Sequence, residues 1–425
     1  MRVLVPVLAL GVLAACGGTE VPLRTTEGPD PTLPAPQQRF LPTVNIAPAT
    51  GWPEDEAPVP AEGLAVRPFF AGLDHPRWLH VLPNGDVLVA ETNAQPAPLR
   101  GLRDVAMRAV MSVAGARPPS ADRISLLRDA DGDGEAEGRS VLLDDLTSPF
   151  GMAYLDGHLY VANTDALVRV PYRLGDAVIT AEPEVVTPLP AMPINHHWTK
   201  GLIAHGGKLY VTVGSNSDHG ENGLDEELGR AAVWEVDPAT GSAVLLATGL
   251  RNPVGIDADP RTGTLWTVVN ERDELGDNLV PDYLARVDRG DWFGWPHLYW
   301  GDRPDPRVDQ SSRPDEEAAR PDYALGAHVA PLGLTFSDGS GLGLGDGAIV
   351  GLHGSWNRRP ASGYEVVFVP FRGGGPTGRP QTILTGFLDS QENARGRPVG
   401  VATAKDGALL VADDVGNTVW RVSRD

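Results

Sequence analysis

Six segments of the chain repeat one short pattern, in which a turn glycine is followed by apolar residues at alternate positions. The pattern is Gly-x-Leu-x-Val or a close variant, and such alternation of β-branched or aromatic residues is typical of a β-strand. A repeated unit usually folds as one small element that buries its apolar face against its neighbours, so repeats weigh more than length in deciding the number of domains. The repeats begin at Gly85, Gly157, Gly207, Gly263, Gly347 and Gly407.

A second pattern lies upstream of several of these segments and leads into another apolar strand. Six units with several strands each, and little helical periodicity, predict an all-β fold, a six-bladed β-propeller. The last blade should close near residues 419–422. Uneven spacing of the repeats places the extra residues in inserted loops. A twisted β-sandwich is the alternative, but it does not explain why the two patterns recur together. The upstream segments are 76–79, 149–152, 252–255 and 397–400.

The composition agrees with a propeller and argues against nucleic-acid binding. The 425 residues include 50 glycines and 39 prolines, which suits a fold rich in turns, and 41% are hydrophobic, enough to fill the interfaces between blades. The formal net charge is −21, so no basic stripe is expected that could neutralise phosphates. We interpret the acidity as favouring solubility of an exported domain.

The N-terminus has the anatomy of an export signal. Arg2 is followed by an apolar run to Ala14 that is too short to span a bilayer, and small residues precede Cys16, the single cysteine of the chain. This order resembles a bacterial lipobox, so residues 1–16 are expected to be a lipoprotein signal peptide. Cys16 would then anchor an exported protein by its lipid, on the outer side of the cytoplasmic membrane or in the periplasm. An ordinary signal peptide with an incidental cysteine is the alternative.

Residues 17–60 form a linker by composition. Ten prolines fall between residues 21 and 60, with almost no periodic apolar pattern, which predicts an extended and semi-rigid spacer. The last part of the linker, from Asn45 to Trp52, has enough apolar side chains to lie against the domain. Residues 61–425 are therefore assigned to the propeller.

Polar clusters next to the repeated strands are the candidates for chemistry. Loops from all blades of a propeller converge at the ends of its central channel, and binding residues are commonly carried on such loops. Each histidine or arginine taken singly could be structural, but arginines in four of five clusters are unexpected in so acidic a protein. Guanidinium groups gathered at one channel end suit a planar polycarboxylate. The clusters are 196–200, 249–253, 270–277, 351–359 and 391–397.

A separate acidic loop has the spacing of half a calcium site. Asp129, Asp131 and Asp133 alternate, and Gly134 stands at the sixth position, as in the first half of an EF-hand loop. The twelfth position is Ser140, so the bidentate glutamate of that motif is missing. The loop is a possible second calcium site, and a metal-free polar turn is the alternative.

Together these segments resemble the PQQ-dependent soluble sugar dehydrogenases of the glucose and sorbosone dehydrogenase family. The resemblance runs in order from about Gly63 to the C-terminus, and GLRNP and HGSWNR are its more specific motifs. It implies a six-bladed propeller with pyrroloquinoline quinone (PQQ) and Ca²⁺ at the channel mouth, acting on a sugar. The matching segments include NHHWTKGL, GLRNPVGIDADP, GDWFGWP, HGSWNRRPASGYEVV and GRPVGVATAKDGALLVADD.

The resemblance also assigns roles to residues. It makes His197 the catalytic base, with His196 and Trp198 beside the cofactor, and places Arg251 and Asn252 at the reactive carbonyl and calcium region. It gives Arg358 or Arg359 to the carboxylates of the cofactor. The backbone carbonyls of the segment Glu271, Arg272 and Asp273 would bind Ca²⁺. The lysine that glucose-oxidising members place against PQQ has no clear counterpart, and His328 lies in roughly that region.

General chemistry agrees with these roles, and two other functions stay open. Hydride removal from an alcohol carbon needs a base near neutral pKa, and the charge that develops on the quinone is stabilised by neighbouring cations. The single cysteine excludes a CxxCH haem attachment, so electrons must pass to an external acceptor, a quinone or a cytochrome. A calcium-dependent propeller hydrolase of the lactonase type, or a non-catalytic binding propeller, is the alternative.

Overall fold

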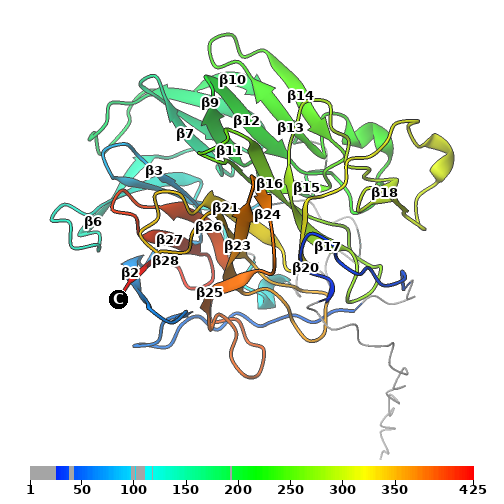
Figure 1. Ribbon diagram of the computed structural model, residues 1–425. Helices are drawn as coiled ribbons and strands as arrows, with labels where there is room; N and C mark the ends of the chain where they lie inside the picture. The colour runs from blue at the N-terminus through cyan, green and yellow to red at the C-terminus, as the bar shows by residue number, and fades with distance from the viewer. Residues whose placement is uncertain (1–24, 38–42, 97–100, 102–110, 117, 192–193) are drawn as a thin grey trace, which may run out of the picture.

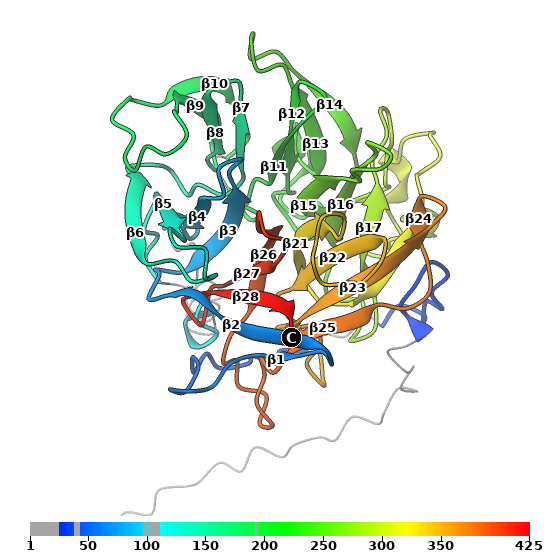
Figure 2. The same ribbon diagram turned by 60° about the vertical axis from the view of Figure 1, so that its left-hand side comes forward.

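The computed structural model describes residues 25–37, 43–96, 101, 111–116, 118–191 and 194–425. The described chain is almost entirely β-structure, and six antiparallel sheets follow one another around a central axis (Figures 1 and 2). The predicted six-bladed propeller is therefore confirmed. Cys16 and the expected signal peptide lie outside the described residues.

Blades 1 to 3 each contain four strands in sequence order. Blade 1 has β3 (Pro76–Val81), β4 (Val87–Glu91), β5 (Arg123–Arg128) and β6 (Gly138–Leu143). Blade 2 has β7 (Met152–Leu155), β8 (His158–Ala162), β9 (Ala166–Pro171) and β10 (Glu184–Pro188). Blade 3 has β11 (Leu202–His205), β12 (Lys208–Val213), β13 (Ala232–Val236) and β14 (Ala243–Thr248).

Blades 4 to 6 carry the longer insertions. Blade 4 has β15 (Asn252–Ala258), β16 (Leu265–Asn270), β17 (Pro281–Arg286) and β20 (Tyr323–Ala327), with the hairpin of β18 (Leu298–Tyr299) and β19 (Arg303–Pro304) inserted before β20. Blade 5 has β21 (Pro331–Phe336), β22 (Gly347–Leu352), β23 (Glu365–Arg372) and β25 (Gln381–Thr385), joined by β1 (Val59–Pro60) and β24 (Gly375–Pro376). Blade 6 has β26 (Pro398–Thr403), β27 (Leu409–Asp413), β28 (Thr418–Arg424) and β2 (Leu64–Ala71).

The six repeated segments form equivalent strands, as predicted. They are β4, β8, β12, β16, β22 and β27, the second strand of each blade. The ring closes at β28, where Val422 lies opposite Val66 of β2. Closure near residues 419–422 is confirmed, and the strand that completes blade 6 comes from the beginning of the domain.

Glycine in or just before the first strands allows the backbones of neighbouring blades to come into contact near the axis. A Cβ atom on Gly201 would lie 2.0 Å from the carbonyl oxygen of Val254 in the next blade, and one on Gly333 would lie 2.2 Å from that of Val399. Only glycine permits such an approach of two backbones. Apolar side chains in or just before these first strands, Phe150, Val254, Leu332 and Val399, belong to one buried cluster near the axis.

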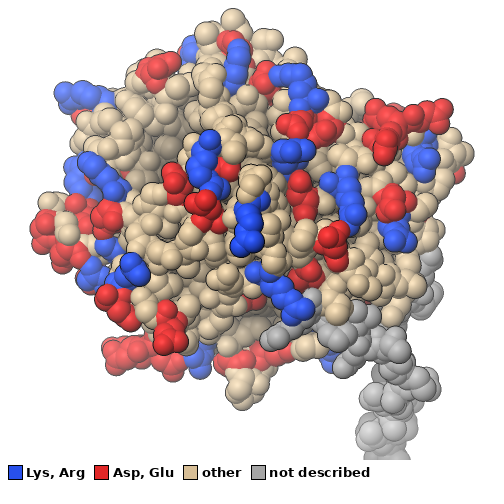
Figure 3. Space-filling view, viewed as in Figure 1, with Lys and Arg blue, Asp and Glu red and all other residues tan. Residues whose placement is uncertain are grey.

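The two ends of the propeller differ in chemistry because its strands alternate in direction. The first strand of each blade begins, and the second strand ends, at the same end, which we call the mouth. The Asp129–Glu137 turn joins β5 to β6 and therefore lies at the opposite end. On the face seen in Figure 3, basic side chains are interspersed with acidic ones and form no continuous basic patch over the described residues.

The described part of the proline-rich tract lies on the propeller. Trp52 packs edge-on against Phe387 and Trp420, and its indole nitrogen donates to Asp413 at 2.6 Å. Asn45 donates its backbone N–H to Trp356 at 2.8 Å. Residues 43–60 therefore cross the mouth side of blades 5 and 6, in agreement with the apolar side chains noted in this stretch. No helix among the described residues is long and apolar enough to cross a membrane.

Candidate active site at the mouth

Blades 3 and 4 bring the two strongest sequence candidates together. His197 precedes β11, and Arg251 and Asn252 stand at the start of β15, so all three lie at the mouth. Gly214 separates them: a Cβ atom there would lie 2.5 Å from Cβ of His197 and 2.4 Å from Oδ1 of Asn252. The close packing of these residues requires glycine at this position.

Among the described residues, only the Nδ1 atom of the His197 ring has a hydrogen-bond partner. Its Nδ1 atom lies 2.8 Å from the carbonyl oxygen of Ser215, which can only accept a hydrogen bond, so Nδ1 carries the proton and Nε2 carries the lone pair. Burial and the neighbouring charge of Arg251 lower the pKa of His197 well below its usual value. The ring of His196 is more exposed and packs edge-on against that of His197, with centroids 4.6 Å apart. His197 is thus a neutral imidazole whose Nε2 lone pair can accept a proton.

Arg251 is a buried cation surrounded by oxygen atoms. Its side chain is 4% exposed. Its Nη1 donates to the carbonyl of Glu271 at 2.7 Å and to that of Asn270 at 3.1 Å. Its Nη2 lies 2.8 Å from Asp218 and 3.3 Å from Asp273. The guanidinium therefore places a fixed positive charge beside His197.

The segment predicted to bind calcium is occupied by protein contacts. The Glu271 carbonyl accepts from Arg251, and burial raises the pKa of the Glu271 carboxyl to about 7. Arg272 is buried and lies 3.0 Å from Asp305. Asp273 accepts a 2.7 Å hydrogen bond from Asn357. The carbonyl of Glu271, one of the three predicted ligands, is thus engaged by the Arg251 guanidinium.

The two adjacent arginines of blade 5 have different surroundings. Arg358 is buried and donates to the side chain of Asn278 at 3.1 Å and to the carbonyl of Pro360, whereas Arg359 is exposed. Within the described residues, no carboxylate lies within 4.0 Å of the Arg358 guanidinium. Arg358, rather than Arg359, is therefore available to an anionic ligand at the mouth.

Blades 1, 5 and 6 contribute a cluster that the sequence did not single out. The buried carboxylate of Asp414 lies 2.9 Å from Nε2 of His353 and 3.7 Å from Nε2 of His75, and it also pairs with Arg77. Although burial opposes it, the charges of these neighbours lower the pKa of Asp414. The Arg77 guanidinium lies over the ring of Trp198, 5.8 Å from its centroid.

Two further basic residues complete the mouth. Arg397 is buried over the ring of Tyr364, and no described carboxylate lies within 4.0 Å of it. Lys200 is fully buried, and its ammonium donates to the carbonyl of Trp198 at 3.3 Å; burial lowers its pKa to about 7. Arg397 and His353 lie inside clusters recognised in the sequence. Lys200 stands in the cluster with His197 but was not assigned a role.

The acidic loop at the opposite end is partly as predicted. Asp129, Asp131 and Asp133 do converge, and Glu137 joins them, with one oxygen of each lying within 4.8 Å of the others. The fourth carboxylate thus comes from the ninth position of the loop. Asp129 accepts hydrogen bonds from the backbone of Gly132 and Gly134, which shapes the turn. The loop is remote from the mouth and takes no part in the site.

Comparison with known proteins identifies the family. The matching family model is described as TrAA12-like, and it covers residues 127–286 and 278–425. The chain belongs to the TrAA12-like family. A PQQ-dependent pyranose dehydrogenase of Coprinopsis cinerea is 28% identical over 231 residues, which are 42% of this chain and 31% of that enzyme. This chain therefore matches about a third of that relative.

Solved structures share the fold of this TrAA12-like protein. The calcium structure of the family AA12 enzyme of Trichoderma reesei has a TM-score of 0.70 at 18% identity, over 90% of this chain and 99% of that one. The holo PQQ domain of the Coprinopsis cinerea pyranose dehydrogenase has a TM-score of 0.67 at 22% identity, over 90% of this chain and all of that one. Both are propellers of the same architecture.

Buried polar atoms without hydrogen-bond partners gather at the mouth of this TrAA12-like chain. Buried polar groups are nearly always paired, so unpaired ones indicate a missing ligand or water. At the mouth they belong to residues of several blades, and guanidinium nitrogens are among them. They include Nε of Arg77, Arg358 and Arg397, Oδ1 of Asn252 and Asn357, and Nδ2 of Asn216.

Proposed function

We propose that this protein is a PQQ-dependent sugar dehydrogenase, which oxidises an aldose, sugar aldehyde or sugar alcohol and passes the electrons to an external acceptor. One observation carries the proposal. A neutral histidine whose Nε2 has no hydrogen-bond partner among the described residues lies at the same mouth as the buried guanidinium groups of Arg358 and Arg397, whose Nε atoms likewise lack one there. A base and an anion-binding surface together are what a planar, polycarboxylate redox cofactor requires.

The mouth residues fit pyrroloquinoline quinone. The cofactor carries three carboxylates, and Arg358 and Arg397 each present a buried Nε–H group without a hydrogen-bond acceptor among the described residues. Trp198 and Trp356, both partly exposed at the mouth, offer flat faces for a planar ring system. Arg358 and Arg397 would hold the carboxylates, and Asn252 would contact the cofactor beside His197.

Proton transfer and charge stabilisation are assigned to residues of the chain. When bound, the quinone would supply an acceptor for one hydride, which carries both electrons of the oxidation. His197 accepts the hydroxyl proton of the sugar at Nε2, since Nδ1 carries a proton that it donates to the carbonyl oxygen of Ser215. Arg251 holds positive charge beside the reacting centre, where it stabilises negative charge that develops there. Asp218 and Asp273 keep the Arg251 guanidinium in place.

Reconstitution tests the proposal. Purified protein is titrated with PQQ, with and without Ca²⁺, and binding is followed by absorbance and calorimetry. Dye reduction is then measured with a panel of aldoses and sugar alcohols. We expect a saturable PQQ complex that reduces dye with at least one sugar. Protein that binds no PQQ under either condition would contradict the proposal.

Calcium is a separate prediction, because no step above depends on it. Binding of Ca²⁺ at residues 271–273 would compete with Arg251 for the carbonyl of Glu271. A calcium-dependent hydrolase needs carboxylates that converge on the metal, and here the corresponding oxygens surround a guanidinium. The oxidoreductase is favoured over the hydrolase for this reason. Activity that is unchanged by chelators would exclude an essential metal.

Export and lipid anchoring at Cys16 are proposed on the sequence alone. The acceptor of the electrons would then be a quinone or cytochrome of the cell envelope. Fatty-acid labelling of the wild-type chain and of Cys16→Ser tests the anchor. Label must appear in the first and be absent from the second, and equal labelling would contradict lipidation at Cys16.

A further inference from the structure

Residues 45–50, which we call the strap, belong to no strand of a blade and lie between two loops of the mouth. Asn45 donates its backbone N–H to the carbonyl of Trp356 at 2.8 Å, in the loop that follows β22. Ala394, in the loop that precedes β26, donates its backbone N–H to the carbonyl of Pro48 at 2.7 Å. The strap therefore joins a loop of blade 5 to the loop that enters blade 6.

The same two loops carry the two buried arginines that are proposed to hold the cofactor. The side-chain amide of Asn45 donates to the carbonyl of Arg358 at 3.0 Å. The carbonyl of Ala47 accepts a 3.4 Å hydrogen bond from Nη2 of Arg397. The Nε atoms of both arginines have no hydrogen-bond partner among the described residues. One short segment from outside the blades thus contacts both arginines and leaves each of them an N–H group for a ligand.

Glu392 extends the contact of Asn45 across the two loops. One oxygen of Glu392 accepts from the Asn45 amide at 2.9 Å, and the other accepts from the backbone N–H of Ala361 at 3.0 Å. These two bonds lower the pKa of the Glu392 carboxyl, so the acceptor is a charged carboxylate at neutral pH. An amide nitrogen carries two hydrogens, so Asn45 can donate to Glu392 and to the Arg358 carbonyl at once, which an aspartate could not. Asn45 and Glu392 together hold the Arg358 loop against the Arg397 loop.

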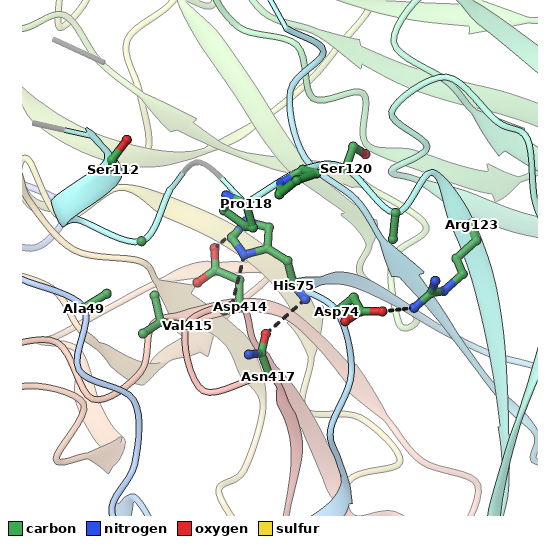
Figure 4. A pocket seen from close by; sticks show the side chains of 13 residues that line it. Ala49, Asp74, His75, Ser112, Pro118, Ser120, Arg123, Asp414, Val415 and Asn417 are labelled. Carbon is green, nitrogen blue, oxygen red and sulfur yellow. Dashed lines mark hydrogen bonds and ion pairs between the residues drawn. The ribbon is translucent and has the colours of Figure 1, made fainter. Parts of the chain in front are cut away.

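The strap continues along blade 6. Ala49 borders a cavity of about 670 Å³ between blades 1 and 6, which Val415 of the loop after β27 also lines (Figure 4). Trp52, just beyond the strap, donates its indole N–H to Asp413 at the end of β27 at 2.6 Å. One end of the strap is therefore fixed to blade 5 through Asn45 and the other end to blade 6, so the strap can set the distance between the two loops.

We propose that Asn45 is a positioning residue for the cofactor, and that the strap sets the distance between the Arg358 and Arg397 guanidinium groups. A planar ring system holds its carboxylates at fixed separations, so two cations bind it well only when they already stand at the matching distance. The strap supplies this preorganisation from outside the blades. The inference rests on the proposed function for the identity of the ligand.

Cofactor affinity tests the role of Asn45. The protein, purified without cofactor, is titrated with PQQ by calorimetry. Asn45→Ala should weaken PQQ binding by about tenfold, the size of a lost hydrogen bond to a charged group, while kcat at saturating PQQ and the urea midpoint stay near those of wild type. Glu56→Gln removes an exposed partner of Arg395 in the same N-terminal tract and is the matched control, which should bind PQQ as wild type does. Equal affinities of Asn45→Ala and Glu56→Gln would overturn the inference.

Glu392→Gln is a second test, in which charge and positioning predict opposite results. The Glu392 carboxylate interacts by charge with the Arg358 guanidinium, so its removal should by electrostatics alone strengthen the binding of an anion. Loss of a charged acceptor for Asn45 should instead loosen the two loops and weaken PQQ binding. Stronger or unchanged PQQ binding in Glu392→Gln would overturn the inference, even if Asn45→Ala failed to fold.

A second ligand separates this inference from the proposed function. Trimesate, a rigid benzene tricarboxylate without redox chemistry, is titrated into the same proteins. If PQQ binds equally to wild type and to Asn45→Ala, the positioning role fails and the dehydrogenase stands. If PQQ does not bind, but trimesate binds wild type and Glu56→Gln about tenfold more tightly than Asn45→Ala, the dehydrogenase fails and the positioning role stands for another polycarboxylate. If neither ligand binds wild type, both proposals fail.

Discussion

The Nδ1 atom of His197 lies 2.8 Å from the carbonyl oxygen of Ser215, and this contact sets which nitrogen can act as a base. A carbonyl cannot donate, so the neutral ring must keep its proton on Nδ1. The Ser215 hydroxyl is 3.0 Å from the same nitrogen, but it donates its own proton to Ser217 at 2.6 Å. The backbone, rather than a side chain, therefore fixes the tautomer.

Replacing the base should remove turnover and spare cofactor binding. His197→Gln loses a proton acceptor, so kcat should fall by about 10²- to 10⁴-fold, the usual size of general base catalysis. PQQ affinity, measured by calorimetry, should stay near that of wild type. Ser215→Ala should change kcat little because the carbonyl contact remains. His205→Gln, at the far end of β11, is the control, and a fully active His197→Gln enzyme would contradict the assignment.

The pH profile should report the lowered pKa of His197. The base works when neutral, and burial and Arg251 lower its pKa below the usual 6.5. The acidic limb of kcat/KM should therefore lie below pH 6.5, with activity constant above it until another group titrates. Arg251→Gln removes a nearby positive charge and should shift this limb to higher pH. A limb that does not move in Arg251→Gln would show that a different group controls the profile.

Two neighbouring arginines provide a matched test of the anion-binding surface. Arg358→Gln removes a buried guanidinium without a carboxylate partner, so PQQ affinity should fall by about tenfold or more. Saturating cofactor should partly restore kcat. Arg359→Gln removes an exposed guanidinium one residue away and should have little effect. Equal effects of the two substitutions on PQQ binding would contradict the proposed role of Arg358.

The sequence predicts the blades because their signal is local and repeated. Each second strand carries its own turn glycine and apolar alternation, and His197 and Arg251 stand next to such strands. The Asp414 cluster as a whole has no comparable signal, although His353 stands in one of the predicted polar clusters. His75 and Asp414 are far apart in the chain, and closure of the ring brings blade 1 beside blade 6. The contacts of residues 43–60 are likewise long-range, so composition alone describes them as a linker.

Close contact between blades should make the axial glycines intolerant of substitution. A Cβ atom on Gly201 would lie 2.0 Å from the carbonyl oxygen of Val254, and a backbone carbonyl cannot move aside as a flexible side chain can. Gly201→Ala should lower the free energy of unfolding by about 3 kcal/mol or more, beyond ordinary overpacking. Gly138→Ala, where nothing lies within 4 Å, is the control and should change it by less than about 1 kcal/mol. Denaturant unfolding measures both, and equal stabilities would contradict the close approach.

The buried ammonium of Lys200 should make stability depend on alkaline pH. Burial lowers its pKa from 10.5 to about 7 in the folded protein, while the unfolded chain keeps the ordinary value. Between these values the unfolded state binds more protons, so the free energy of unfolding should rise with pH above 7, by up to about 1.4 kcal/mol per pH unit. Urea denaturation at pH 7, 8 and 9 should show this slope in wild type and in Lys208→Met, which removes an ammonium paired at the surface of the same blade. Lys200→Met should lack the slope and be more stable than wild type at pH 7. If the free energy of unfolding had the same pH dependence in all three proteins, the pKa of Lys200 would not be lowered in the folded state.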